Sequence, residues 1–598
     1  MKNTDQVIEV VPLVALPPQG NQKYSYIVPN NMNAVPGDLV RIPFSNRIIN
    51  GVVWSKTKKK NIYLKNIIEI ERKNIATKHD LRWLEMFSDY SLESLSLLTK
   101  ALVSNRKSFT EKRFNNPEIS KRHGSIVIKF TEKELEKILK TKGAGQILIL
   151  IPEIIFGDDI SNICKLAGRK CVFYNNQLSQ KEKNDVTNEI YENQFCVVIA
   201  THSGIFLPFS NLTAIILIEP ALPSHRQWNM HPFYDARVGA YLKSIIYQIP
   251  LTFLVSIQTF ATYSLSNVKN KYQTFEKITV INKNWNEQGF FSDEILNLIK
   301  RKISQQNKIL IYHDAIGYES FYVCKDCGNT LRCEQCGSIL QRQNKDLFCK
   351  ACKAITGTLQ AFCGKCGSPK INALKTGTRS IEQLLKKAFP ELNIIRIDKG
   401  VKITDSLISS LTDANIVITT QILFSIVNKA FFDCCIVPDF STVTGITHFD
   451  SLEKSLIILQ RLNKLIRKNT DPTIYINERN NDSGILKHIK NRTINELIEN
   501  DTEDRKQLLF PPFGRMLTCE KEFATEILAQ KETRILRSKI SNSESRGQIN
   551  IIIFKRQSKY VGQIIIRTNE KNISVLCKAI PNSWSIDVPF SWSNLFAH

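Results

Sequence analysis

The sequence lacks an apolar run long enough to cross a membrane. The longest one, about Ile147–Phe156, is interrupted by Pro152 and Glu153 and falls well short of the roughly 20 residues that a spanning helix needs. The first residues, MKNTDQVIEV, also lack the apolar core of a secretory signal. We therefore expect a cytoplasmic protein with no membrane contact. In that compartment disulfides are not expected, and paired cysteines more often bind metal.

Acidic side chains are scarce relative to basic ones. The 598 residues include 56 Asp and Glu against 81 Lys and Arg, which leaves a formal net charge of +25. Such a surplus favours an anionic partner, and nucleic acid is the usual one. An AT-rich genome, which loads proteins with Lys, Asn and Ile, explains the same surplus equally well, so the charge alone is weak evidence. Composition is otherwise that of a folded protein, and the length predicts three to five domains.

Cysteine is concentrated in one cluster. Eight of the fifteen cysteines form four CxxC pairs, and Gly328, Gly337 and Gly367 follow three of the pairs. A CxxC turn presents two thiolates to one ion, and glycine suits the left-handed backbone of a zinc knuckle. A redox CxxC would occur once, and iron–sulfur clusters typically use other spacings. We therefore expect two structural Zn²⁺ ions, held by Cys324, Cys327, Cys333, Cys336, Cys349, Cys352, Cys363 and Cys366.

The other cysteines are scattered, mostly within apolar runs, and we expect them to be small buried hydrophobic residues. They are Cys164, Cys171, Cys196, Cys434, Cys435, Cys519 and Cys577.

Residues 1 to about 75 are predicted to form a small β barrel or sandwich, because short β-rich runs alternate with turn residues. The runs are Val7–Leu13, Tyr24–Val28, Leu39–Ile42, Gly51–Trp54 and Ile67–Ile70. Near the last loop lie Lys56, Lys58, Lys59, Lys60 and Lys65. These lysines form either a phosphate-contacting edge or a solvated charge run, and the sequence does not separate the two.

Residues 76 to 122 are predicted to hold one amphipathic helix followed by a polar, basic linker. Leu81, Leu84, Phe87 and Leu95 follow the spacing of one helical face.

From residue 123 onward, strand-length apolar runs alternate with helical segments, which is typical of parallel sheets with crossover helices. Thr131 is expected to cap the first of these helices, with Glu134 three residues later. The first set of strands is Ser125–Phe130, Gln146–Ile151, Cys171–Tyr174, Cys196–Ala200, Ala214–Glu219 and Leu251–Ser256. The second is Ile309–Tyr312, Ile394–Ile397, Ile416–Thr419, Cys434–Val437 and Thr473–Ile476. The cysteine cluster interrupts the second set, and a last unit begins near the turn Phe510–Phe513.

These elements, in this order, resemble the family of primosomal protein N-prime, the bacterial replication-restart helicase PriA of superfamily 2. The resemblance covers nearly the whole chain, and its strength lies in the collinearity of motifs that are individually weak. Stretches Tyr24–Tyr26, Pro36–Phe44 and Gly51–Val53 are similar to the family's 3′-DNA-end-binding domain. Further matches are Ile147–Ile154, Ala200–Ser203, Phe206–Pro208, Gly377–Thr378, Ile395–Asp398, Thr420–Gln421 and Pro511–Phe513.

The resemblance implies an α/β multidomain architecture. It comprises a β domain over residues 1–75 that binds 3′ DNA ends, a helix and basic linker over 76–122, and a first RecA-like lobe over 123–300. A second RecA-like lobe over 301–495 carries the zinc insertion 323–368, and an α+β C-terminal domain covers 496–598. The resemblance also implies nested pairing, in which Cys324, Cys327, Cys363 and Cys366 hold one ion and the other four cysteines hold the second. In the family this subdomain helps to load the replicative helicase and contacts DNA.

The family's ATP-binding motifs are missing from their expected places. No GxxxxGK[ST] loop lies between Ser125–Phe130 and Gln146–Ile151, although such a loop cradles the phosphates and holds Mg²⁺. The family's Asp-Glu-Glu-His reads Ile218–Ala221 here, so that Glu219 is a degenerate remnant of the catalytic site.

Two further motifs of the ATP site are altered. The family's Ser-Ala-Thr reads Ser256-Ile257-Gln258, and its arginine-bearing motif reads Gln460–Arg467, with both glycines lost and Lys464 in place of one Arg. These losses predict lobes that act as a scaffold, with neither ATP nor Mg²⁺ as a cofactor. In addition, residues 91–122 are too few for the family's winged-helix domain.

The 3′-end pocket of the family uses an aromatic residue, an Asp, a Gly and a Lys. By position these become Tyr24, Ser25, Ser45 and Lys65. Tyr24 can stack on a terminal base and Lys65 can meet a phosphate, but Ser25 lacks the carboxylate that would accept a hydrogen bond. A half-buried strand aromatic explains Tyr24 equally well.

Three functions follow from these observations. The first is a primosome protein for replication restart that binds forked or single-stranded DNA and recruits replication proteins through the zinc module, without ATPase activity. The second is an ATP-dependent 3′-to-5′ DNA helicase with divergent motifs. The third is a zinc-stabilised protein-interaction scaffold that has also lost its DNA contacts, against which the positive charge argues mildly.

Overall fold

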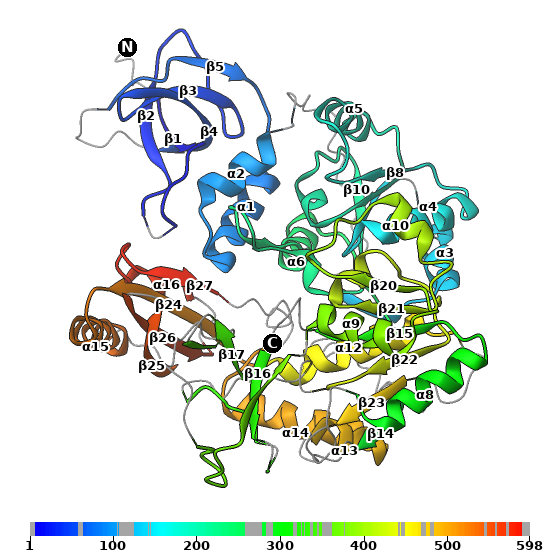
Figure 1. Ribbon diagram of the computed structural model, residues 1–598. Coiled ribbons are helices and arrows are strands. Elements are labelled where there is room, and N and C mark those ends of the chain that lie inside the picture. The colour runs from blue at the N-terminus through cyan, green and yellow to red at the C-terminus, as the bar shows by residue number, and fades with distance from the viewer. Residues whose placement is uncertain are drawn as a thin grey trace.

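A computed structural model describes most of the chain, arranged as two parallel-sheet lobes with β domains on one side of them (Figure 1). The described residues are 6–18, 20–57, 64–104, 106, 125–141, 143, 145–256, 278–282, 291–314, 320–324, 326–327, 329–334, 339–343, 346–349, 362–375, 377–440, 443, 449–467, 474–478, 484–542, 547–556, 559–569 and 573–588. Among their helices, none is long and apolar enough to span a membrane.

The N-terminal unit is a five-stranded antiparallel sheet in the order β2-β1-β4-β3-β5. Its strands are β1 (Gln6–Pro12), β2 (Tyr24–Val28), β3 (Leu39–Phe44), β4 (Arg47–Thr57) and β5 (Glu69–Arg72). A bridge between Ile27 and Asn66 joins β2 to the segment before β5. Gly37 has a φ of 97°, and a Cβ there would lie 2.0 Å from the Ala76 carbonyl oxygen, so this turn requires glycine. The first four strands predicted from the sequence are confirmed, and the fifth begins and ends two residues later than predicted.

The next segment contains two helices, so the prediction of one amphipathic helix is wrong. Helix α1 (Lys78–Ser91) ends where Leu92 adopts a left-handed φ of 53°, and α2 (Leu95–Val103) begins three residues later. Leu95 continues the apolar spacing of α1 in the sequence, but the backbone reverses before it. Both helices pack on the first lobe, where the Trp83 indole donates to the Gly239 carbonyl oxygen at 2.9 Å. Of the predicted basic linker, only Arg106 and the residues up to 104 lie within the described part.

The first lobe is a six-stranded parallel sheet in the order β6-β13-β10-β7-β9-β8. Its strands are β6 (Ser125–Lys129), β7 (Gln146–Leu150), β8 (Cys171–Tyr174), β9 (Val197–Ala200), β10 (Leu212–Ile218) and β13 (Leu251–Val255). Its helices are α3 (Glu132–Thr141), α4 (Gly157–Leu166), α5 (Gln180–Tyr191) and α6 (Ala236–Tyr247), with short η2 (Ile154–Phe156), η3 (His202–Phe206) and η4 (Pro223–His225) and the hairpin β11 (Arg226–Gln227) and β12 (Tyr234–Asp235). Thr131 accepts the Glu134 backbone N–H at 3.2 Å, as predicted for the cap.

The second lobe repeats this architecture, with six parallel strands in the order β14-β23-β22-β15-β21-β20. They are β14 (Ile278–Asn282), β15 (Ile309–Tyr312), β20 (Ile394–Ile397), β21 (Ile416–Thr419), β22 (Cys434–Val437) and β23 (Ile474–Glu478). Its helices are α8 (Asp293–Ser304), α9 (Thr378–Ala388), α10 (Asp405–Ser410), η5 (Gln421–Ser425), α12 (Ser451–Leu465), α13 (Gly484–Lys490) and α14 (Ile494–Gln507). The sequence did not predict β14, whose partner β23 lies almost 200 residues away.

The cysteine insertion and the C-terminal domain pack against each other beside the second lobe (Figure 1). The insertion carries β16 (Ser320–Cys324), β17 (Leu340–Gln343), β18 (Asp346–Cys349) and β19 (Ile371–Lys375) between β15 and α9. The C-terminal domain has β24 (Arg515–Phe523), α15 (Glu526–Asn542), β25 (Gly547–Arg556), β26 (Lys559–Thr568), α16 (Ile573–Lys578) and β27 (Ser585–Asp587). One apolar cluster joins Tyr322, Leu340 and Leu347 of the insertion to Phe554 and Val561.

Candidate functional site

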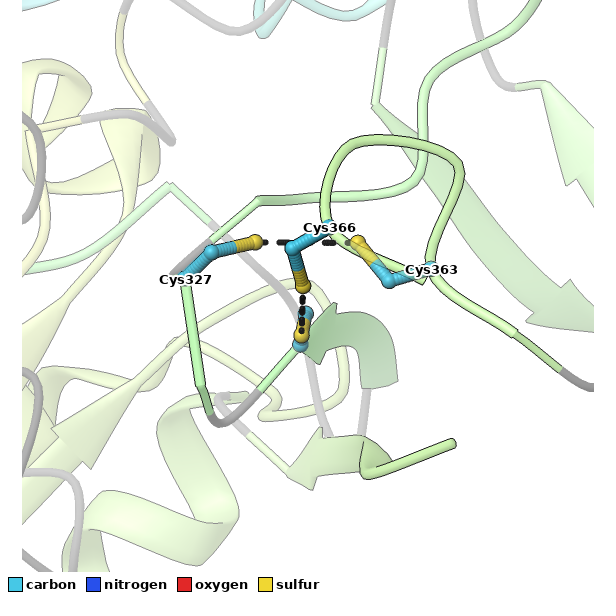
Figure 2. A group of neighbouring side chains, drawn as sticks. Cys327, Cys363 and Cys366 are labelled. Carbon is cyan, nitrogen blue, oxygen red and sulfur yellow. Dashed lines mark hydrogen bonds between the residues drawn. The ribbon is translucent and has the colours of Figure 1, made fainter. Parts of the chain in front are cut away.

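Four cysteine sulfur atoms converge at one end of the insertion. Cys324 ends β16 and Cys327 lies in the turn after it, whereas Cys363 and Cys366 lie in the turn before β19. The Sγ atoms of Cys324 and Cys366 are 3.6 Å apart, as are those of Cys327 and Cys363 (Figure 2), and all four lie within 4.8 Å of one another. A tetrahedral ZnS₄ site with Zn–S bonds of about 2.3 Å places its sulfurs about 3.8 Å apart. The group therefore fits zinc.

The backbone around these sulfurs has the geometry of two facing knuckles. Gly367 adopts a φ of 71°, as predicted for this glycine, and its N–H donates to the Cys363 carbonyl oxygen at 2.8 Å. The backbone N–H groups of Cys366 and Lys365 point at the Cys363 sulfur and lower the pKa of that thiol to about 6. A thiolate is the form that binds metal, so the backbone prepares this ligand before an ion arrives.

The two knuckles are also bonded to each other outside the sulfur group. The carboxylate of Asp326, within the first knuckle, accepts the Ser368 hydroxyl at 2.7 Å and the Lys370 ammonium at 3.2 Å, both just after the second knuckle. These bonds orient the two turns that supply the sulfurs, as outer partners do in many metal sites.

The other four cysteines are only partly within the described residues. Cys333 and Cys349 are buried, at 2% and 0% exposure, in the apolar cluster that the insertion shares with the C-terminal domain. Cys336 and Cys352 lie outside the described residues. Within the part of the chain that the structure describes, the group at Cys324 is the one set of three or more ligands close enough for a metal. The second ion therefore stays a prediction.

The residues proposed for a 3′-end pocket lie along one strand and its neighbours. The Tyr24 ring meets the Phe44 ring edge-on at 5.0 Å between centroids, and exposed Ser45 follows Phe44 in a turn with a φ of 50°. The Lys65 carbonyl oxygen accepts the Ile27 N–H at 3.0 Å, and the Lys65 side chain is exposed.

Along β2, Tyr24 lies on the side of buried Tyr26 and Val28, and is half-buried itself. Alternation along a strand places Ser25 on the opposite face. The fold thus places Tyr24 against Phe44, next to Ser45, and separates Ser25 from Tyr24, whereas Lys65 lies beside Ile27, three residues further along β2. The role of all four residues in DNA binding stays a prediction.

Glu219 lies at the carboxyl end of β10 in a left-handed conformation, with a φ of 49°, and is fully buried. Its carboxylate accepts the Ser256 backbone N–H at 3.0 Å and the Ser256 hydroxyl. It also accepts the Lys464 ammonium, from α12 of the other lobe, at 2.6 Å. Three residues that the sequence assigned to altered family motifs, 245 residues apart at the extremes, therefore form one hydrogen-bonded group. Residues 257 and 258, the rest of the Ser-Ala-Thr position, lie outside the described part.

Sequence reasoning missed two further contacts between the lobes. Arg461 makes a bidentate pair with Glu153, at 3.1 and 2.7 Å, and Lys429 reaches Asp159 at 2.5 Å. Arg461 and Lys464 are three residues apart on α12 and therefore share a helix face. Two cations at that spacing, beside the apolar face of the helix, were the available signal.

The fold combines two parallel-sheet lobes, an antiparallel β domain at the N-terminus and a four-cysteine insertion. Residues 13–104 match the family model of the PriA 3′ DNA-binding domain. The chain is 23% identical to the replication restart protein PriA of Rickettsia conorii, over 91% of this chain and 92% of that protein. It is 26% identical to the Borreliella burgdorferi protein of the same name, over 62% of this chain and 59% of the relative. The chain is thus similar to PriA replication restart proteins over most of its length, and its residues 13–104 match their 3′ DNA-binding domain.

Among solved structures, the chain is similar to RecG bound to a three-way DNA junction, with a TM-score of 0.37 and 9% identity. That match covers 70% of this chain and 51% of the RecG chain.

Proposed function

We propose that this protein binds forked or single-stranded DNA during replication restart and recruits partner proteins through its cysteine insertion, without turning over ATP. The observation that carries the proposal is the match of residues 13–104 to a 3′ DNA-binding domain. That segment is fastened to the first lobe through buried groups, among them Trp83 and Asp80. Bound DNA would therefore be held in a fixed relation to the lobes.

Two features of the first lobe support the proposed lack of ATP turnover. Only Phe130 and Thr131 separate β6 from α3, and a phosphate-binding loop needs a longer glycine-rich segment there. Glu219, the remnant of the catalytic motif, is engaged by Ser256 and Lys464. A carboxylate held by an ammonium group is a poor partner for Mg²⁺ or for a water nucleophile.

The proposed DNA contact uses Tyr24 and Lys65, with Ser45 beside them. Tyr24 would stack on the last base and Lys65 would meet its phosphate. The proposed metal content is two Zn²⁺ ions, one at the Cys324 group and one held by Cys333, Cys336, Cys349 and Cys352. Cys333 and Cys349 lie against the C-terminal domain, so the second ion would also stabilise that contact.

The test is an ATPase assay with and without forked DNA, run beside a DNA-binding titration on the full-length, zinc-loaded protein. We expect tight binding whose affinity falls steeply between about 50 and 200 mM salt, and no DNA-stimulated ATP hydrolysis. DNA-dependent turnover that disappears in Glu219→Gln would replace this proposal with an ATP-dependent helicase. If the protein binds partner proteins but not DNA, the result would instead support the function of a protein-interaction scaffold.

End recognition is tested with Tyr24→Leu, which keeps apolar bulk against Phe44 while removing the aromatic face. We expect about tenfold weaker binding of a fork with a free 3′ end, and little change on circular single-stranded DNA, which has no end. Equal loss on both DNAs would show that Tyr24 acts through the stability of the domain.

A further inference from the structure

Among the described residues, three ion pairs join the two lobes, and in each of them the first lobe supplies the carboxylate and the second lobe the cation. They are Glu153–Arg461, Asp159–Lys429 and Glu219–Lys464, called here the interlobe ion pairs. The facing surfaces are therefore complementary in charge, because one carries carboxylates and the other carries cations. Charge complementarity of this kind fixes the orientation of two surfaces more than it adds to their affinity.

The Glu219–Lys464 pair contains the most deeply buried carboxylate of the three pairs. The Glu219 side chain is 0% exposed and that of Lys464 is 35% exposed. The Lys464 ammonium also donates to the Ser256 hydroxyl, which in turn donates to Glu219. Two donors from the first lobe and one from the second therefore share one buried carboxylate. Breaking the lobes apart would leave that carboxylate without its counter-charge.

The Glu153–Arg461 pair adds direction to the contact. A guanidinium that meets a carboxylate through two parallel bonds tolerates little rotation. Arg461 is held from its own lobe as well, since its guanidinium stacks on the Phe424 ring at 4.2 Å and donates to the Phe424 carbonyl oxygen. Glu153 is held by the Ser224 hydroxyl at 3.2 Å. Both members are thus oriented before they meet.

The third pair lies at the rim. Lys429 is 67% exposed and Asp159 is 27% exposed. The neighbouring Asn428 amide donates to Asp159 and to the Ile155 carbonyl oxygen, at 3.3 and 3.2 Å. A rim contact of this kind is screened by salt first.

We propose that the interlobe ion pairs hold the two lobes in one closed orientation, set by charge and ionic strength instead of by nucleotide. This proposal rests on the proposed absence of ATP turnover. In a nucleotide-driven protein the groups around Glu219 would be released and re-engaged in each cycle. Here they bond to one another across the lobes, so the protein presents a constant surface to DNA.

The experiment measures energy transfer between dyes on single full-length molecules, attached through unnatural amino acids at the exposed positions Lys181, in α5, and Lys402, just before α10. We expect one high-transfer population that ATP with Mg²⁺ does not shift and that high salt lowers. In Arg461→Met with Lys464→Met, the fall should occur at about threefold lower salt.

The matched control is Arg467→Met. It removes a cation two residues after the same helix ends, but Arg467 pairs with Asp433 inside the second lobe, at 3.0 Å, so lobe closure should be unchanged. The charge-swapped pair Glu153→Arg with Arg461→Glu should restore closure that Arg461→Glu alone loses.

The same samples are assayed for ATP hydrolysis, which separates the two proposals. Turnover would overturn the proposed function. Absence of turnover together with closure that is insensitive to Arg461→Met and Lys464→Met would overturn the interlobe proposal alone. A shift of wild-type closure on adding ATP would also overturn it.

Discussion

Asp80 and Arg106 form a buried bidentate ion pair, with Arg106 Nη1 and Nη2 at 2.8 and 3.3 Å from the two carboxylate oxygens. Asp80 lies in the first turn of α1, and its carboxylate also accepts the Tyr247 hydroxyl, from the first lobe, at 2.7 Å. The Asp80 carboxylate therefore joins the matched DNA-binding segment to Arg106, two residues beyond that segment, and to the first lobe.

Asp80→Asn is expected to destabilise the protein by about 3–5 kcal/mol, because it leaves the Arg106 charge buried without its partner. The measurement is denaturant unfolding followed by tryptophan fluorescence, which reports on Trp83 nearby. Asp89→Asn, at an exposed position on the same helix, serves as the control and should change stability little. Equal effects of the two substitutions would contradict the role given to the buried pair.

The same carboxylate predicts an acid-sensitive step. Burial by itself would raise the pKa of Asp80, but the charge and hydrogen bonds of Arg106 outweigh it and hold the pKa well below its ordinary value. A carboxyl group whose pKa is lowered by folding contributes stability that is present above its unfolded pKa and is lost as the pH falls below it. Stability should therefore fall below about pH 4, more steeply in the wild type than in Asp80→Asn.

Lys243 predicts the opposite pH response. It is 2% exposed, its ammonium lies 4.4 Å from the centre of the Trp83 ring, and burial lowers its pKa to about 7 despite the nearby charge of Asp80. Between that value and about 10.4, the ordinary lysine pKa, the unfolded chain binds a proton that the folded chain does not. Stability should rise with pH in this window.

The measurement is the midpoint of urea unfolding at pH 7, 8 and 9 for the wild type and for Lys243→Met. We expect the wild type to gain up to about 1.4 kcal/mol per pH unit from this group, and the variant to lack that gain. Identical pH slopes would show that Lys243 remains charged in the folded protein.

Metal content tests the cysteine group directly. Cys363→Ser should remove one bound zinc ion per chain, because three thiolates and a hydroxyl do not make a closed structural site. Zinc is counted by elemental analysis after gel filtration. Cys196→Ser is the control, since Cys196 is a half-buried thiol of the first lobe and its loss should leave the zinc count unchanged.

Phe554→Ala tests the coupling between the insertion and the C-terminal domain. Phe554 is 3% exposed and belongs to the cluster with Tyr322, Leu340 and Leu347, so we expect a loss of about 3–5 kcal/mol and faster removal of zinc by a chelator. Phe523→Ala is the matched control, because Phe523 is 5% exposed and belongs to a cluster that contains no residue of the insertion. It should cost similar stability and leave the rate of zinc removal unchanged.

Local sequence patterns determined the order and type of the elements. The apolar runs that predicted strands appear at nearly the same residues, because a strand buried on both faces needs a continuous apolar segment. The cap at Thr131 followed from its hydroxyl, and the left-handed Gly367 from the absence of a side chain. The facing pairs at Cys324 and Cys363 were implied by the family resemblance, and the structure places those four sulfurs together.

The sequence did not predict the break between α1 and α2 or the strand β14, and each omission has a physical reason. The break after Ser91 requires Leu92 in a left-handed conformation. Such a break is usually predicted from a glycine or a proline, and neither occurs at this position. Strand β14 was not predicted because it is short and is stabilised by pairing with β23. The stability of a β-strand depends on its partner more than on local propensity.

The contacts between distant parts were decided by tertiary structure alone. Glu219 and Lys464 were recognised as altered motif residues, but their mutual ion pair depends on how two lobes dock. The same holds for Arg461 with Glu153 and for the packing of Phe554 on the insertion. Periodicity and spacing report on interactions within a few residues, whereas an ion pair across hundreds of residues is fixed only when the folded surfaces meet.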